Sequence, residues 1–89
     1  MHFAFEFDEA KSRANETKHG IDFVEAQTLW LDADLLRLPA RSDAEPRSLF
    51  IGRIGERHWS AIVTYRGDTI RLISVRRSRT REVQAYEGE

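Results

Sequence analysis

The sequence predicts an α+β fold, in which a small antiparallel β-sheet is accompanied by two N-terminal helices and one C-terminal helix. Two observations lead to this class. Residues 48–77 contain three consecutive strand-like segments separated by turns that contain glycine. Segments with helical spacing and capping residues lie before and after that region. Because a chain of 89 residues supports only one small core, we expect a single domain over residues 1–89.

The N-terminal segment is predicted to pass from a short strand into a capped helix. Residues 2–7 alternate weakly and are rich in aromatic side chains, which is typical of a strand. Asp8 is the expected N-cap of a helix over Glu9–His19. Gly20 follows, and glycine readily adopts the positive φ that ends many helices.

This first helix is expected to present two different faces. Its small residues form the expected packing stripe: Ala10, Ala14 and Thr17. Three polar residues at spacings of four and three share another face: Lys11, Asn15 and Lys18. The sequence therefore predicts that the lysines lie together on an exposed surface.

A second helix is predicted to begin soon after Gly20 and to end near Leu31. Asp22 and Glu25 have the spacing of a capping box, which marks a helix N-terminus. Three apolar residues form its expected buried stripe: Phe23, Ala26 and Trp30.

The rest of the chain is predicted to be mainly strands. The expected strands are Ala33–Pro39, Ser48–Ile54, Arg57–Tyr65 and Thr69–Arg77, with a loop over residues 40–47. Both faces of the Arg57–Tyr65 strand are partly apolar, so we expect it to be central in the sheet. A last, polar helix is expected over Thr80–Tyr86.

Side chains of the last strand should alternate between the two faces of the sheet. Strict alternation puts Arg71, Ile73, Val75 and Arg77 on one face, and Ile70, Leu72, Ser74 and Arg76 on the other. Arg76 and Arg77 are therefore expected to point in opposite directions, and at most one of them lines any given cleft.

Composition excludes several classes of protein. The chain contains no cysteine, which rules out disulfides and thiolate zinc sites and is compatible with a reducing cytoplasm. No apolar run is long enough to span a membrane, and the N-terminus lacks a signal-peptide pattern. We therefore expect a soluble cytoplasmic protein with no membrane partner.

Charge is distributed unevenly along the chain. Residues 1–47 carry a net charge of −4, whereas residues 48–89 carry +3. Between Arg66 and Arg81 there are six arginines and one acid, Asp68. Such a run is usually a solvated edge, but the planar arginine side chain also suits phosphate and carboxylate. The sharper interpretation is an anion site for RNA or for an acidic partner protein.

The chemistry-bearing residues favour catalysis without a cofactor. The sequence has no phosphate-binding loop, no dinucleotide glycine pattern and no metal-binding histidine spacing, since His2, His19 and His58 are widely scattered. We therefore expect no metal and no cofactor. Metal-free RNA cleavage remains open, because RNA supplies its own 2′-hydroxyl nucleophile. Arginine and lysine would then stabilise charge, and histidine, lysine, glutamate or tyrosine would move protons.

One set of motifs resembles a known family. The pattern Phe7-Asp8-x-x-Lys11, then Asn15, then Lys18-His19-Gly20-Ile21-x-Phe23 is similar to the opening signature of the BrnT toxins. Three later pieces agree with it in order: Phe50-Ile51-Gly52-Arg53-Ile54, the strand Ile70–Arg77, and Glu82 with Tyr86 on the last helix.

The resemblance implies a fold, an activity and partners. BrnT proteins are toxins of bacterial type II toxin–antitoxin pairs, with a RelE-like fold, and they act as ribonucleases that block translation. The implied partner is a BrnA-type antitoxin with a DNA-binding domain, in an assembly of two toxins and two antitoxins. Operator DNA is contacted only through the antitoxin, while the RNA substrate is free or ribosome-associated.

Carried over to this sequence, the resemblance implies two groups of site residues. The catalytic group is Lys18, His19, Arg53 and Arg76. The RNA-binding group is Lys11, Ser74 and Arg77. Arg53 and Arg76 are assigned to phosphate binding and transition-state charge, and His19 or Lys18 to proton transfer. The ordinary alternatives are helix capping for His19 and solvation for the lysines.

Two other functions remain open. The chain is alternatively a catalytically weak or inactive toxin homologue that binds an antitoxin and serves as corepressor of its operon. A stand-alone nucleic-acid-binding domain is the weakest alternative, because no helix-turn-helix pattern or long basic stretch is present.

Overall fold

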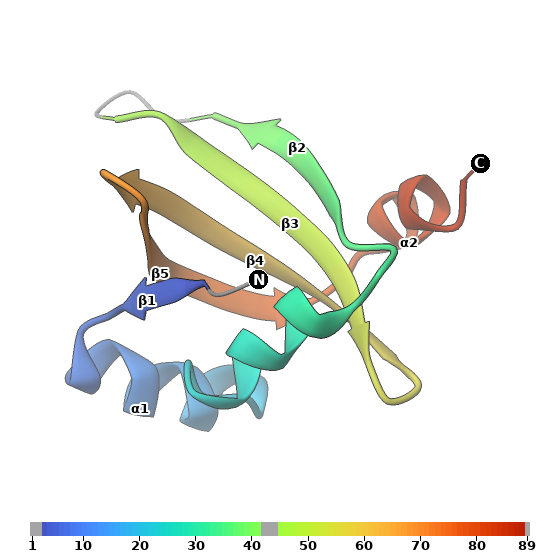
Figure 1. Ribbon diagram of the computed structural model, residues 1–89. Helices are drawn as coiled ribbons and strands as arrows, with labels where there is room; N and C mark the ends of the chain where they lie inside the picture. The colour runs from blue at the N-terminus through green and yellow to red at the C-terminus, as the bar shows by residue number, and fades with distance from the viewer. Residues whose placement is uncertain (1–2, 42–44, 89) are drawn as a thin grey trace.

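The computed structural model describes residues 3–41 and 45–88, which form a mixed five-stranded sheet with helices on both sides (Figure 1). The strand order across the sheet is β1-β5-β4-β3-β2. In chain order the elements are β1 (Ala4–Glu6), α1 (Glu9–His19), the 3₁₀ helix η1 (Glu25–Leu31), β2 (Leu36–Ala40), β3 (Arg47–Ile54), β4 (Arg57–Arg66), β5 (Thr69–Arg77) and α2 (Thr80–Tyr86). The predicted α+β class is confirmed, and β4 is the central strand.

Most element bounds agree with the prediction. Those of α1, β5 and α2 are the predicted ones, and β3 and β4 differ by one residue. β2 begins at Leu36 instead of Ala33, because Asp32 forms a turn there. Its Oδ1 accepts from the Asp34 amide at 2.8 Å, and its carbonyl accepts from the Leu35 amide at 3.2 Å. Residues 42–44 of the predicted loop and residue 2 of the predicted first strand lie outside the described residues.

The prediction of a purely antiparallel sheet is wrong. β1 pairs with β5 in parallel, with Ala4 opposite Thr69 and Glu6 opposite Arg71. The other strand pairs are antiparallel. Parallel strands need a long connection, so no short-range turn pattern marks this pairing in the sequence.

The second predicted helix is a 3₁₀ helix that begins later than expected. Asp22 Oδ1 accepts from the Glu25 amide at 2.7 Å, as a capping residue would, but the helix itself starts at Glu25. The predicted buried stripe of Phe23, Ala26 and Trp30 is confirmed, and these side chains pack against the sheet in the main core.

Helix α1 packs through polar residues, so its predicted small-residue stripe is wrong. Ala10, Ala14 and Thr17 are exposed, whereas Ser12 and Asn15 are buried. Ser12 Oγ accepts from the Phe23 amide at 2.8 Å. The buried face of α1 is the one that carries hydrogen-bonding side chains. It packs against backbone N–H and C=O groups of neighbouring segments, and buried backbone groups require hydrogen-bond partners.

Asn15 supplies those partners at the edge of β5. Its Oδ1 accepts from the Val75 amide at 3.1 Å, and its Nδ2 donates to the carbonyls of Val75 and Ile21 at 2.8 Å each. β1 pairs with β5 only as far as Arg71, so Val75 would otherwise present an open sheet edge. One buried amide therefore joins α1, the segment leading to η1 and the sheet.

A β-bulge on β5 overturns the predicted alternation of its side chains. Ser74 pairs with Ile62 and Leu72 with Val63, so Ile73 is an extra residue with no partner on β4. As a result Leu72 and Val75 are both buried in the same core, although strict alternation separates them. Beyond the bulge, Arg76 and Arg77 lie on opposite faces as predicted.

No helix in the described part of the chain is long and apolar enough to cross a membrane.

Replacing Asn15 by alanine is expected to destabilise the fold severely. The change leaves three buried backbone groups without partners, and we expect the free energy of unfolding to fall by roughly 3 kcal/mol. Urea denaturation measures this. The control is Thr17→Ala on the same helix, which removes an exposed hydroxyl that donates to the Arg13 carbonyl. Equal stability of the two variants would contradict the role given to Asn15.

Candidate functional site

The seven predicted site residues lie in three separate places. Lys11, Lys18, His19 and Ser74 line one pocket between α1 and β5. Arg53 lines a second pocket, formed by η1, the β3–β4 hairpin and α2. Arg76 and Arg77 lie at the end of β5 and contact other side chains.

The lysine–histidine pocket combines the last turns of α1 with the bulge of β5. It has a volume of about 200 Å³. Its lining residues are Lys11, Ala14, Asn15, Lys18, His19, Ile73 and Ser74. The lysines share the face that was predicted for them, and the α1–β5 contact through Asn15 holds the two walls together.

The charge of this pocket is entirely of one sign. In the part of the chain that the structure describes, its lining includes two lysines, a histidine and a hydroxyl but no carboxylate. Among the described residues, the side chains of Lys18 and His19 make no hydrogen bond or ion pair with another residue, so their donors are available to a ligand. Such a surface attracts phosphate, and an imidazole beside it can move a proton.

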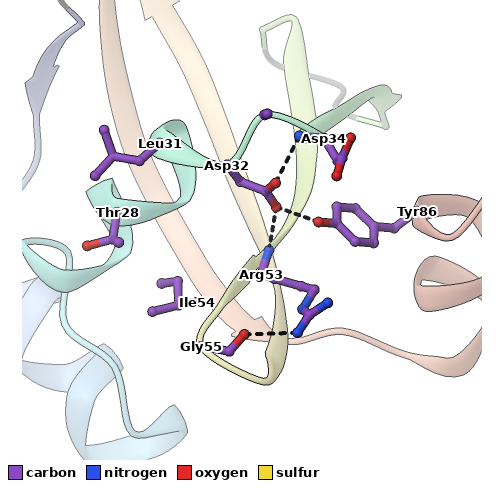
Figure 2. Close-up of a pocket in the computed structure, with 9 residues that line it drawn as sticks. Thr28, Leu31, Asp32, Asp34, Arg53, Ile54, Gly55 and Tyr86 are labelled. Carbon is purple, nitrogen blue, oxygen red and sulfur yellow. Dashed lines mark hydrogen bonds between the residues drawn. The ribbon is translucent and has the colours of Figure 1, made fainter.

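A larger pocket surrounds Asp32, and we call it the Asp32 pocket (Figure 2). It has a volume of about 410 Å³. The Asp32 carboxylate accepts hydrogen bonds from the Tyr86 hydroxyl at 2.6 Å and from the amides of Arg53 and Asp34 at 2.8 Å each. One carboxylate thus positions η1, β3 and α2 around the pocket.

These contacts shift two pKa values. Burial alone would raise the pKa of Asp32, but the hydrogen bonds from Tyr86, Asp34 and Arg53 outweigh it and lower that pKa below its ordinary value. Burial, together with the neighbouring Asp32 carboxylate, raises the pKa of Tyr86 to about 12. Tyr86 is therefore a neutral hydroxyl at physiological pH, and its O–H donates a hydrogen bond to the Asp32 carboxylate.

Arg53 lies at the rim of the Asp32 pocket. Its side chain is exposed, and Nη2 donates to the Gly55 carbonyl at 3.3 Å (Figure 2). The carboxylates of Asp32 and Asp34 line the same pocket, so this pocket contains both the positive charge of Arg53 and two negative charges.

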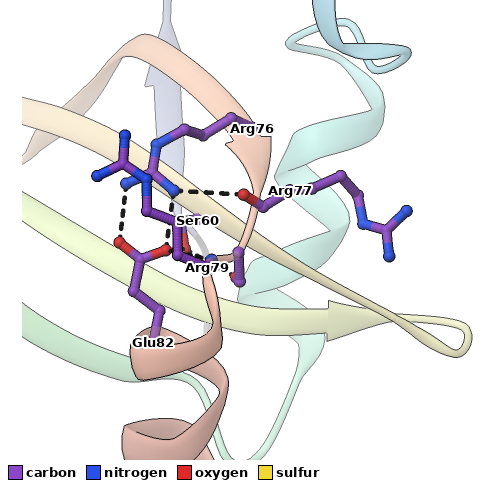
Figure 3. Close-up of polar contacts among 6 residues, drawn as sticks. Ser60, Arg76, Arg77, Arg79 and Glu82 are labelled. Carbon is purple, nitrogen blue, oxygen red and sulfur yellow. Dashed lines mark hydrogen bonds and ion pairs between the residues drawn. The ribbon is translucent and has the colours of Figure 1, made fainter.

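Arg76 is engaged by a carboxylate of α2 (Figure 3). Its Nη1 and Nη2 donate to Glu82 Oε1 and Oε2, each at 2.8 Å. Glu82 Oε1 also accepts from Ser60 Oγ and from the Arg79 amide at 2.8 Å each. The bidentate contact from Arg76 lowers the pKa of Glu82 from 4.5 to about 2, despite burial.

The other contacts of α2 are also polar. No residue of α2 is fully buried. Tyr86 donates to Asp32, and Glu87, just beyond the helix, lies 2.9 Å from His58 Nε2. Helix α2 is therefore held against the sheet largely by hydrogen bonds and ion pairs.

Arg77 points to the opposite face of the sheet from Arg76. Its guanidinium carbon lies 5.6 Å from the centre of the Trp59 ring, which is the geometry of a cation–π contact. The described residues contain no group of three or more histidine, cysteine, aspartate or glutamate side chains arranged to hold a metal ion.

Sequence reasoning missed the two carboxylates that organise these surroundings. Asp32 lies 21 residues from Arg53 and 54 from Tyr86, so no local spacing signals its role. Glu82 was noted only as part of a family resemblance. Glu82 lies three residues after Arg79 and accepts a hydrogen bond from the Arg79 amide, but arginine is not a recognised N-cap residue, so the sequence carried no clear signal for this contact.

A comparison with protein-family models identifies a match. The chain matches, over residues 7–82, the family model described as the ribonuclease toxin BrnT of type II toxin–antitoxin systems. A search of curated proteins found no match. The matched range contains all seven predicted site residues, together with Asp32 and Glu82.

The Glu82 contacts are expected to make stability depend on acid pH. Because the folded-state pKa is lowered from 4.5 to about 2, stabilisation is fully present above the ordinary pKa and is lost as the pH falls toward 2. The loss should be at most about 3 kcal/mol. In Glu82→Gln this part of the pH dependence should disappear, as measured by urea unfolding between pH 5 and pH 2.

The matched control is Glu9→Gln, because Glu9 is exposed and forms only a 4.0 Å ion pair with Arg13. An unchanged acid dependence in Glu82→Gln, or an equal change in Glu9→Gln, would contradict this assignment.

Proposed function

Because the chain belongs to the BrnT family of ribonuclease toxins from type II toxin–antitoxin systems, we propose that it cleaves RNA in the lysine–histidine pocket. The family establishes a ribonuclease toxin with an antitoxin partner. The location of the cleavage site, and the steps below, are our proposal.

The observation that carries the proposal is the single-signed lining of this pocket. Lys11, Lys18 and His19 line it, Ser74 adds a hydroxyl, and none of the described acids lines it to compete with a phosphate. RNA binding depends chiefly on contacts to its phosphates, and exposed ammonium groups supply them. The pocket also contains the His19 imidazole, a group that can both accept and donate a proton.

The proposed chemistry needs no metal ion. The His19 imidazole removes the proton from a 2′-hydroxyl, whose oxygen then attacks the adjacent phosphorus. Lys11 and Lys18 stabilise the negative charge of the phosphorane, with Ser74 donating a hydrogen bond. The bond to the 5′-oxygen breaks as that oxygen takes a proton from the imidazolium or from Lys18. The products are a 2′,3′-cyclic phosphate and a free 5′-hydroxyl.

The predicted arginines have different positions in this proposal. Arg76 is already paired with Glu82, so it binds phosphate only if that contact breaks. Arg77 is available on the Trp59 face as an additional RNA contact. Arg53 lies beside Asp32 and Asp34, which makes it a poor phosphate ligand, and we leave it out of the cleavage step.

Further parts of the proposal follow from the family. We propose a single RelE-like domain over residues 1–89 that acts in the cytoplasm and inhibits translation by cutting free or ribosome-associated RNA. A BrnA-type antitoxin neutralises it in an assembly of two toxins and two antitoxins. That antitoxin alone contacts operator DNA.

A second candidate function is a non-catalytic corepressor that binds an antitoxin. It is favoured by exposed apolar side chains around one groove. Phe3, Val24 and Leu31 are 44%, 63% and 84% exposed, and all three line a cavity of about 310 Å³ with Phe5 and Trp30. Exposed apolar clusters of this kind are typical of protein interaction surfaces.

The cleavage proposal predicts the effect of removing the pocket's proton carrier and cation. His19→Ala and Lys18→Ala should each reduce RNA cleavage by roughly 100-fold or more. Cleavage is measured on purified protein with labelled RNA, with and without ribosomes, and should persist in EDTA. The control is Arg13→Ala, which removes a positive charge from an exposed position of α1.

The outcomes separate the two candidates. If the wild-type protein binds its antitoxin but leaves RNA intact under every condition, the corepressor function is correct. If RNA is cut and His19→Ala and Lys18→Ala retain full activity, the site lies elsewhere. If EDTA abolishes cleavage, the metal-free mechanism is wrong.

A further inference from the structure

We propose that the Asp32 pocket is a binding site for a guanine base. This site is separate from the lysine–histidine pocket. It rests on the proposed function only in that RNA is one source of the base, the other being a free guanine nucleotide.

The pocket has the size and walls of a site for a flat ring. Its volume of about 410 Å³ lies within the usual range of small-ligand sites, about 300–1,000 Å³. Figure 2 shows Leu31 and Ile54 on one side of the pocket and Arg53 and Tyr86 on the other. A planar base fits between the apolar wall and the aromatic ring of Tyr86.

The polar side chains of the pocket that remain available are the Arg53 guanidinium, the Asp34 carboxylate and the Thr28 hydroxyl. The Asp32 carboxylate already accepts three hydrogen bonds and serves to position its neighbours. The Asp34 carboxylate is exposed and accepts none from a described residue. Arg53 has five N–H donors in its side chain, and its one hydrogen bond there is to Gly55.

This combination selects against phosphate and in favour of guanine. Two carboxylates in one small pocket repel an anion. Guanine carries two adjacent N–H donors, at N1 and N2, which match the two oxygens of a carboxylate. Its O6 and N7 are adjacent acceptors that match the fork of an arginine. No other RNA base offers both pairs, so Asp34 and Arg53 together specify guanine.

The backbone that carries the two recognition side chains is held in place before a ligand arrives. Asp32 holds the amides of Arg53 and Asp34 and the hydroxyl of Tyr86, so three lining residues are tied to one carboxylate. Asp32 is thus a positioning residue, while Asp34 and Arg53 contact the base. Such preorganisation reduces the ordering cost of binding.

The first test is nucleotide binding by the whole chain, measured by calorimetry and by NMR shifts. GMP should bind roughly tenfold or more tightly than AMP, CMP or UMP. IMP, which lacks the 2-amino group, should bind more weakly than GMP. The shifts should fall on residues of the Asp32 pocket. Equal affinities for the four nucleotides, or shifts confined to Lys18 and His19, would overturn the proposal.

Variants of the two recognition residues provide the second test. Asp34→Asn keeps the shape but replaces one acceptor oxygen by a donor, so the preference of GMP over AMP should fall to near unity. Arg53→Lys keeps the charge but loses the fork, and should weaken GMP binding. The control is Asp68→Asn, at the exposed β4–β5 turn, which should keep the preference. A preference that survives Asp34→Asn would sink the proposal.

RNA cleavage separates this inference from the proposed function. Binding of GMP without any RNA cleavage leaves the guanine site intact and removes the ribonuclease assignment. Cleavage of RNA by a protein that shows no preference for GMP supports the ribonuclease assignment and overturns the guanine site. If GMP binds and cleavage sites cluster at a fixed distance from guanines, RNA is the source of the base. If GMP binds and cleavage ignores guanine, the ligand is a free nucleotide.

Discussion

The hydrogen bonds of one buried amide determine how the helical and sheet parts of this protein fit together. Asn15 takes the place of a neighbouring strand at Val75, where β1 no longer covers the edge of β5. It also binds the carbonyl of Ile21, which leads the chain into η1 and the main core. The position of α1 over the bulge, and therefore the lysine–histidine pocket, depends on this contact. The sequence pattern places Asn15 on a polar face of α1, but in the structure Asn15 connects this helix to the sheet.

The parts of the fold that the sequence predicts well are those with local causes. Asp8 and Gly20 mark the two ends of α1 through contacts within a few residues, and alternation marks the extent of β5. The parallel pairing of β1 and the bulge at Ile73 depend on partners from elsewhere in the chain, and no spacing rule contains that information. The same holds for the buried face of α1, where backbone groups of Val75 and Phe23 select Asn15 and Ser12 over nearby alanines.

The candidate site was predictable to a similar degree. Residue type and family resemblance drew attention to Lys18, His19, Arg53 and Arg76, and two of these share a pocket. Their separation into three surroundings arises from carboxylates on distant elements. Glu82 neutralises Arg76, and Asp32 and Asp34 surround Arg53. An arginine's availability for phosphate is thus a property of its tertiary neighbours, which a one-dimensional pattern does not contain.

The pairing of the two ends of the chain has a consequence for synthesis on the ribosome. The lysine–histidine pocket joins α1 to residues 73 and 74, and β1 has no strand partner until β5 exists. Contacts so distant in sequence form late, because the intervening loop must close first. A nascent chain that has exposed α1 but not β5 therefore has no such pocket. The lysine–histidine pocket therefore forms only after most of the polypeptide has emerged from the ribosome.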